Sequence, residues 1–324
     1  MIPKFDYVRP DSLRQAIKQL AASGTRIHAG GTDLLGCLRD RVFTADKVVS
    51  IGGLSELGGI KRASDGGLTI GALTTLAQLA SDPVILKDYP ALAQGALSAA
   101  SPQLRNQGTL GGNLCQRPRC WYFRGDFHCL RKGGNLCYAV GGRNDYHCIF
   151  GGDACYIVHP SDTAPALVAL GARVHINGAN GSRTIPLESF FVPPGKDITR
   201  ENVLAPNEIL TNVSLPAPAP NQRSSYRKMR ARGAWDFALA GVALSLRFGV
   251  GGEVEGARVV LSGVAPMPWR VAEAEKALTG KRITEDTARA AAEICIKGAE
   301  PMEYNGYKVN LVRALVEEAL LALR

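Results

Sequence analysis

Cysteines are the residues of this sequence with the most evident chemistry. Six of the eight lie in one stretch of 41 residues, whereas Cys37 and Cys295 stand apart in apolar helical contexts. Without an export signal, clustered cysteines more often bind metal than form disulfides. Because Cys37 and Cys295 lie apart from this cluster in apolar contexts, we interpret them as small core residues. The candidate metal ligands are Cys115, Cys120, Cys129, Cys137, Cys148 and Cys155.

The spacing of these cysteines restricts the choice of metal. Successive gaps of four, eight, seven, ten and six residues contain no C-x-x-C pair, so zinc-ribbon and zinc-finger spacings are absent. Cys115 and Cys120 have the spacing of the first two cysteines in a plant-type 2Fe–2S motif. The position where that motif requires its third cysteine is Phe123. Aromatic and basic neighbours favour an anionic iron–sulfur cluster because they exclude water and offset its charge. Zinc and non-ligand cysteines remain the alternatives, and His128, His147 and His159 are further potential ligands.

Two glycine-rich loops could bind phosphate. One spans Ala29 to Leu34 after an expected strand, and the other spans Asn106 to Asn113. Glycines let backbone N–H groups approach a phosphate closely. Neither loop matches G-x-G-x-x-G or a P-loop, so each alone could be an ordinary turn. Together they favour a dinucleotide, because its pyrophosphate can be held from both sides.

The expected elements that position these loops fall into two groups. Before a Pro-rich linker at 216–221, alternating short strands and helices begin with a β-α-β-like unit of about fifty residues, whose helix Asp11 and Ser12 can cap. Strand patterns on either side of the turns at 65–67 and 178–181 predict two hairpins. After the linker, strand patterns at 224–229, 237–248 and 257–264 precede helices at 269–278, 284–296 and 308–323. This order predicts a separate α+β domain with an antiparallel sheet and helices on one side.

Composition and charge exclude several classes of protein. Lys and Arg number 38 against 29 Asp and Glu, but these bases are scattered apart from a modest cluster between Arg223 and Arg232. We therefore expect neither nucleic-acid nor membrane binding. Apolar runs are too short for a membrane span, and the first residues lack a secretory signal, so we expect a cytoplasmic protein. No catalytic triad, H-E-x-x-H or paired catalytic carboxylates are found, so we expect no catalytic residue.

Three motifs, taken in order along the chain, carry a family resemblance. They are Gly30-Gly31-Thr32-Asp33-Leu34, then Arg105-Asn106-x-Gly108-Thr109-Leu110-Gly111-Gly112-Asn113, then Tyr226-Arg227-Lys228-Met229 with Asp236. The sequence resembles the FAD-binding medium subunit of the xanthine oxidase, or molybdenum hydroxylase, family over nearly its whole length. The resemblance implies an α+β fold with a two-subdomain FAD domain of the PCMH type. A C-terminal domain of three-stranded antiparallel sheet with helices follows.

The resemblance also implies domain boundaries and site residues. The expected units are an N-terminal FAD subdomain at 1–56, a second at 57–215, a linker at 216–222 and the C-terminal domain at 223–324. Thr109, Gly112 and Asn113 match the second pyrophosphate loop. Asp162 matches an acidic residue near the ribityl or diphosphate part of FAD. Leu204 matches an apolar residue that contacts the adenine or the flavin, and Lys228 matches a basic residue near the flavin. The first loop comprises His28, Ala29, Gly30, Gly31, Thr32, Asp33 and Leu34.

The sequence departs from the common family pattern by an insertion at about 116–158. It resembles the insertion of the 4-hydroxybenzoyl-CoA reductase β subunit, which carries a 4Fe–4S cluster, and one in some molybdenum aldehyde dehydrogenase subunits. The implied ligands are Cys120, Cys129, Cys137 and Cys155, with Cys148 as the first replacement. Cys115 adjoins the FAD loop.

The implied function is electron transfer through FAD and 4Fe–4S, with molybdopterin and 2Fe–2S on a large and a small partner subunit. A dimer of heterotrimers is expected from the family. Our first hypothesis is 4-hydroxybenzoyl-CoA reductase, with ferredoxin as electron donor. The alternatives are the FAD subunit of a molybdenum aldehyde dehydrogenase and a stand-alone flavin oxidoreductase. A zinc-bearing interaction module that binds RNA is a third class.

Overall fold

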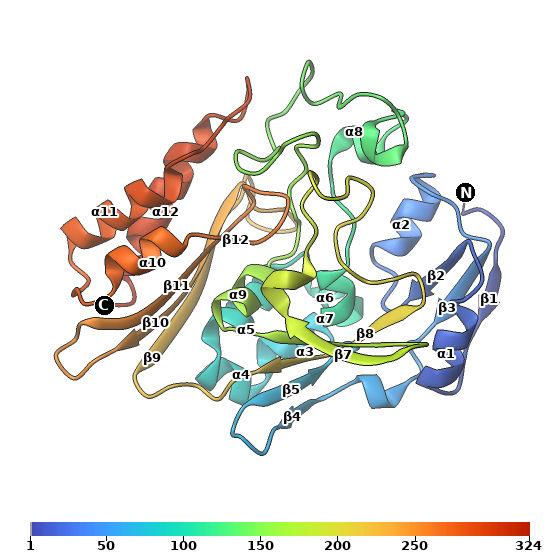
Figure 1. Cartoon of the computed structure of the whole chain (residues 1–324), viewed down its shortest axis with the longest axis horizontal. Coiled ribbons are helices and arrows are strands. Elements are labelled where there is room, and N and C mark those ends of the chain that lie inside the picture. Colours follow the sequence, from blue (N-terminus) through green and yellow to red (C-terminus); the bar gives the residue numbers. More distant parts are fainter. Residues whose placement is uncertain (1) are drawn as a thin grey trace.

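The computed structural model describes residues 2–324, which form three sheets arranged from right to left in Figure 1. The first sheet is parallel, in the order β1 (Asp6–Val8), β3 (Lys47–Ser50), β2 (Thr25–His28). Its connections contain α1 (Leu13–Gln19) and α2 (Leu34–Arg39). The Ser12 side chain accepts a hydrogen bond from Gln15 N, which confirms the predicted start of α1.

The second sheet is antiparallel and has five strands in the order β4-β5-β8-β6-β7. Their bounds are Ile60–Arg62, Leu68–Gly71, Glu208–Leu215, Arg173–Gly178 and Gly181–Pro186. Both predicted hairpins, β4–β5 and β6–β7, are confirmed. Short helices pack beside this sheet: α3 (Leu76–Ser81), α4 (Pro83–Asp88), α5 (Pro90–Ser98), α6 (Pro102–Gln107), α7 (Leu110–Leu114) and α9 (Thr163–Ala169).

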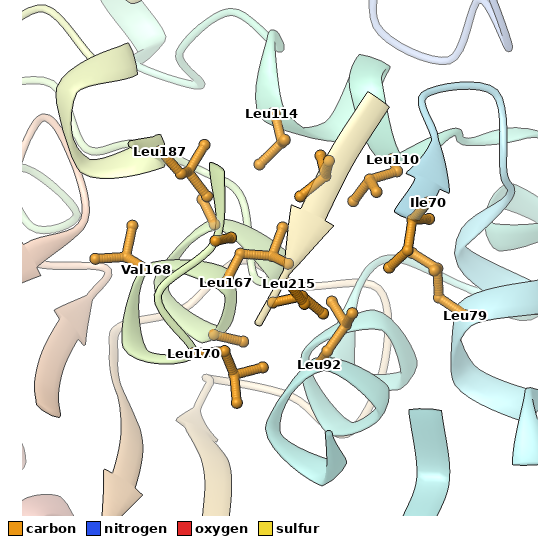
Figure 2. Close-up of a cluster of buried hydrophobic side chains, with 14 of the residues drawn as sticks. Ile70, Leu79, Leu92, Leu110, Leu114, Leu167, Val168, Leu170, Leu187 and Leu215 are labelled. Carbon is orange, nitrogen blue, oxygen red and sulfur yellow. The ribbon is translucent and has the colours of Figure 1, made fainter. Parts of the chain in front are cut away.

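Apolar side chains between these helices and the second sheet form the largest core. Figure 2 shows Leu92 on α5 and Leu167 on α9 directed toward Leu215 of β8. All three side chains are buried, and their removal from water is the main stabilising contribution here. This core fixes α7, and therefore the second glycine loop at its start, against the sheet.

The third sheet has four antiparallel strands, which corrects the predicted three. Its order is β12 (Trp269–Arg270), β11 (Val254–Ser262), β10 (Ala240–Phe248), β9 (Gln222–Met229). Residues 269–270, expected to begin a helix, instead pair with Leu261 and Val260. The sheet packs against α5 and α9 on one side. Its strands also contact α10 (Ala272–Leu278) and α12 (Tyr307–Leu321). The remaining helix, α11 (Glu285–Ile296), packs on α10 and α12.

The cysteine-rich insertion lies at the top of the molecule in Figure 1, above the helices of the second sheet. Its regular structure is limited to α8 (Trp121–Arg124) and a 3-10 turn at Leu130–Lys132. At its end, Ile149 and Phe150 both donate backbone hydrogen bonds to Val264 O, which ties the insertion to the C-terminal sheet. Among residues 2–324, no helix is long and apolar enough to cross a membrane.

Candidate functional site

The two predicted glycine loops touch each other. A Cβ atom added to Gly30 would lie 1.8 Å from the carbonyl oxygen of Gln107, so no side chain fits between the loops. Gly31 has a φ of +72°, in the left-handed region that glycine adopts without strain. In the second loop, Thr109 Oγ1 accepts a hydrogen bond from Gly112 N at 3.2 Å. The contact brings two glycine-rich backbones within reach of a single group.

Two cavities adjoin this contact and share part of their lining. The first has a volume of about 260 Å³, is mostly apolar and includes Leu34 and Leu204. The second has a volume of about 630 Å³ and includes Asn113, Asp162 and Trp235. Both are lined by Gly30, Gly31, Thr32, Asp33, Thr109, Gly112 and Gln116. Two cavities that share a glycine-rich wall suit a dinucleotide, with one ring system in each cavity and the diphosphate at the shared wall.

The Asp33 carboxylate connects the first loop to the cysteine-rich insertion. Arg117 N donates to Oδ2 at 2.7 Å, Arg124 Nη2 donates to Oδ1 at 2.8 Å, and Arg119 donates to Oδ1 as well. Burial would raise the pKa of this carboxyl, but Arg119 and Arg124 outweigh that effect and lower the pKa. Asp33 therefore stays ionised and holds the loop in place.

A second ionic contact joins the residue before α9 to β9. The buried Asp162 carboxylate accepts hydrogen bonds from Tyr226 Oη at 2.7 Å and Lys228 Nζ at 2.8 Å. Burial raises the pKa of Asp162, and the ammonium of Lys228 opposes the rise. Asn113 Oδ1 accepts from Thr163 Oγ1 at 2.6 Å, so the second loop is fixed to the start of α9.

Eleven of the thirteen predicted FAD residues line one or both cavities, whereas His28 and Lys228 do not. His28 lies at the end of β2 beneath Gly31, whose added Cβ would meet its ring at 2.6 Å. Lys228 lies behind Asp162. The eleven lining residues are Ala29, Gly30, Gly31, Thr32, Asp33, Leu34, Thr109, Gly112, Asn113, Asp162 and Leu204.

Several lining residues were not predicted from the sequence. Trp235 and Phe237 line the second cavity from the loop after β9, together with Asp236. Trp235 N donates to the carbonyl of Ala100 at 3.3 Å, and both residues have positive φ values, 51° and 49°. A Trp-Asp-Phe run soon after a strand is the only sequence signal, and it does not show which cavity it faces.

Four cysteines of the insertion, Cys120, Cys137, Cys148 and Cys155, are close enough to affect one another's electrostatics. Burial raises the pKa of the Cys120 thiol to about 12, and the neighbouring thiols of Cys155 and Cys137 contribute. Cys148 behaves alike, with its pKa also raised to about 12 by burial and by the same two neighbours. Cys129 and Cys120 share one apolar cluster. Nevertheless, no group of three or more His, Cys, Asp or Glu side chains in residues 2–324 is arranged to hold a metal ion.

The remaining cysteines have other environments. Cys115 ends α7 and lines the first cavity, beside the loop as expected. Cys37 and Cys295 are buried in apolar clusters, as predicted for core residues.

Two buried side chains next to inserted cysteines have polar atoms without partners, His147 beside Cys120 and Arg131 beside Cys155. In the described part of the chain, Nε and Nη2 of Arg131 and Nδ1 of His147 have no hydrogen-bond partner. Arg131 Nη1 donates to Glu201 at 2.6 Å, and its guanidinium opposes the burial-driven rise in the pKa of Cys155. Unsatisfied buried polar atoms are costly, and the two unpartnered guanidinium nitrogens of Arg131 are donors that would suit an anionic group.

Comparisons with known proteins agree with the two-part architecture. The model of the "FAD binding domain in molybdopterin dehydrogenase" matches residues 3–218, and that of the "CO dehydrogenase flavoprotein C-terminal domain" matches residues 224–323. The Escherichia coli aldehyde oxidoreductase FAD-binding subunit PaoB is 34% identical, covering 99% of this chain and 98% of the relative. The carbon monoxide dehydrogenase medium chain of Hydrogenophaga pseudoflava is 30% identical over 99% and 97%.

A solved structure shares the whole fold. Carbon monoxide dehydrogenase from Hydrogenophaga pseudoflava superimposes with a TM-score of 0.80 at 29% identity, covering 100% of this chain and 98% of that chain. The chain therefore belongs to the FAD-binding medium subunits of the molybdenum hydroxylase family. It is an oxidoreductase subunit whose cofactor is FAD.

Proposed function

We propose that this chain is the FAD-binding electron-transfer subunit of a molybdenum-dependent aldehyde oxidoreductase. The observation that supports it best is the similarity to the PaoB aldehyde oxidoreductase subunit over nearly the full length of both chains. The pair of cavities joined at the glycine loops supports the same cofactor role. This places the aldehyde alternative ahead of the 4-hydroxybenzoyl-CoA reductase expected from the insertion.

The chain's own residues hold and orient the cofactor in this proposal. Backbone N–H groups of the two glycine loops bind the diphosphate, Leu204 contacts one ring system, and Trp235 and Phe237 lie beside the other. Lys228 acts through Asp162, because their ion pair fixes the wall of the second cavity. FAD, when bound, exchanges electrons singly or in pairs and so connects one-electron clusters to a two-electron substrate site.

We further propose that Cys120, Cys129, Cys137 and Cys155 hold a 4Fe–4S cluster. Three of these thiols lie near one another, and Cys129 shares an apolar cluster with Cys120. The unpartnered guanidinium nitrogens of Arg131 would offset the negative charge of four thiolates. Cys148 remains the replacement if one of the four is not a ligand.

The partners in this proposal are a large molybdopterin subunit and a small 2Fe–2S subunit, assembled as a dimer of heterotrimers. The Hydrogenophaga relative is the medium chain of its enzyme, which supports assembly with larger and smaller chains. The ferredoxin donor belongs to the reductase hypothesis and is not part of this proposal.

The test is activity and cofactor content of the assembled complex. We expect aldehyde oxidation with an artificial acceptor, no dehydroxylation of 4-hydroxybenzoyl-CoA, and about four iron and four sulfide per chain beyond those of the 2Fe–2S subunit. The reverse pattern of activities would overturn the aldehyde assignment, and turnover by the isolated chain would favour a stand-alone oxidoreductase.

Cysteine variants test the cluster ligands separately. Cys155→Ser should lower the iron content of this chain while FAD remains. Cys295→Ser is the matched control, because Cys295 is also buried but lies in the C-terminal core. Full iron in Cys155→Ser would contradict its role as a ligand.

A further inference from the structure

Arg119 belongs both to the cysteine-rich insertion and to the lining of the second cavity. Its guanidinium donates hydrogen bonds to the Asp33 carboxylate of the first glycine loop and, at 3.2 Å, to Gln116 Oε1. Arg119 also lines a third cavity of about 420 Å³, which shares part of its lining with the second. The proposed function gives no role to this arginine.

The face of the same guanidinium lies near an aromatic ring. Its central carbon is 5.2 Å from the centroid of the Phe237 ring, a distance at which a cation and a ring face attract each other. A planar guanidinium can donate hydrogen bonds from its edge while its face packs on a ring, whereas an ammonium group cannot do both in this way. Arg119 therefore contacts Asp33 and Phe237 with one group.

Phe237 belongs to the loop at 230–237 between β9 and β10, here called the Phe237 loop, which contains no helix or strand. Trp235 and Phe237 line the second cavity but are 63% and 45% exposed. Within the loop, Arg232 Nη2 donates to the Trp235 carbonyl at 2.9 Å. A hydrogen bond that leaves the loop, from Trp235 N to the Ala100 carbonyl, is long at 3.3 Å. Exposed loops with such contacts open easily, so the contact with Arg119 matters for the position of this loop.

The backbone of the Phe237 loop is strained at Trp235. Its φ of +51° lies in the left-handed region, which is unfavourable for a bulky side chain. Such conformations persist only where the surrounding structure holds them. The contact between Arg119 and Phe237, two residues further along, supplies part of that support.

We propose that Arg119 is a positioning residue that fastens the Phe237 loop to the first glycine loop and thereby slows the release of FAD. The inference rests on FAD as the cofactor of the two cavities. It requires no metal at the inserted cysteines, because Arg119 acts through Asp33 and Phe237. An arginine that only stabilised the first loop would act without Phe237, and this difference can be measured.

The first test is the rate of FAD dissociation from the assembled complex, followed by flavin fluorescence after dilution. Arg119→Lys keeps a positive charge near Asp33 but removes the planar group that packs on Phe237. We expect FAD release about fivefold faster than in the unmodified complex, in keeping with the strength of a cation–π contact. An unchanged rate would overturn the inference.

A second arginine of the insertion provides the matched control. Arg143 also pairs with an aspartate, Asp145, and its guanidinium lies 5.0 Å from the centroid of the Tyr304 ring. It lines neither of the cavities at the glycine loops. FAD release should therefore be unchanged in Arg143→Lys, and an equal acceleration there would overturn the inference.

A double variant shows whether Arg119 acts through Phe237. Phe237→Leu alone should speed FAD release, because it removes the ring that lines the second cavity. Adding Arg119→Lys to Phe237→Leu should have little further effect, since two residues that act through one contact are not additive. A further fivefold acceleration in the double variant would overturn the inference.

Hydrogen exchange of the Trp235 amide tests the same contact without FAD. In the apoprotein of the full chain, this amide should exchange faster in Arg119→Lys, because the loop opens more often. Unchanged exchange would overturn the inference. If Arg119→Lys fails to fold, Phe237→Leu and Phe237→Tyr replace it. Faster exchange in the leucine variant alone would support the contact, and equal exchange in both would overturn it. Absence of FAD from the unmodified complex would instead refute the cofactor on which the inference rests.

Discussion

Gly30 lies where the two glycine loops touch, and the absence of a side chain allows that contact. A Cβ atom there would overlap the Gln107 carbonyl, so Gly30→Ala must push the two loops apart. The cost of such overpacking is about 1–3 kcal/mol. We expect FAD affinity to fall by about tenfold or more, measured by flavin fluorescence during titration of the apoprotein.

A nearby glycine provides the control for this substitution. The Cβ atom of Gly52→Ala would lie 3.9 Å from its nearest neighbours, an ordinary van der Waals distance. FAD affinity should therefore stay unchanged in Gly52→Ala. Equal losses in both variants would show that the contact at Gly30 has no special role.

The ion pairs of Asp33 should make the free energy of unfolding depend on pH. Its folded pKa lies below the usual 3.8, so the folded state binds fewer protons than the unfolded state across that range. The stabilisation is fully present above about pH 4 and is lost as the pH falls through the lower folded value. Asp33→Asn should cost about 1.5–3 kcal/mol at neutral pH. The difference in unfolding free energy should shrink below about pH 4, and a difference independent of pH would contradict the ion-pair account.

At the scale of elements, β9 joins the C-terminal sheet to the cofactor cavities through Tyr226. Its hydroxyl donates to Asp162, the residue that directly precedes α9. Tyr226→Phe keeps the buried ring but removes a hydrogen bond to a carboxylate, at a cost of about 1.5–3 kcal/mol. We expect a lower urea midpoint with an unchanged slope. The control is Tyr7→Phe on the exposed ring of β1, and a similar loss there would remove the special role of Tyr226.

The sequence predicted most elements because their signals are local. Ser12 caps α1, and turn residues separate the strands of both predicted hairpins. β12 was missed because a two-residue strand has no periodicity, and its structure comes from pairing with β11. The three residues of β1 likewise depend on parallel pairing with β3.

In the candidate site, too, local features could be predicted from the sequence and long-range contacts could not. The glycine loops were found because glycine pairs are visible in a sequence. The partners of Asp33 lie 84 or more residues away, so its ionic contacts could not be predicted. For Lys228, the sequence gives the residue but not the direction of its side chain, which bonds to Asp162 rather than lining the cavity.

At the scale of the whole molecule, the cavities are lined by segments from both halves of the chain, from the first glycine loop to Phe237. A ligand bound there should stabilise the fold by mass action, about 2.7 kcal/mol at a concentration of one hundred times Kd. The thermal midpoint of the apoprotein should rise with FAD concentration. Riboflavin should raise it much less, because it lacks the diphosphate and the adenine and so would leave the shared glycine wall and one of the two cavities empty. Equal effects of the two ligands would contradict the two-cavity account.

The central claim is that the glycine loops and the two cavities bind an intact dinucleotide. The most direct measurement is to release the flavin from the purified complex with acid and identify it chromatographically, with protein quantified on the same sample. The account predicts about one FAD per copy of this chain. Flavin mononucleotide alone, or no flavin, would contradict it.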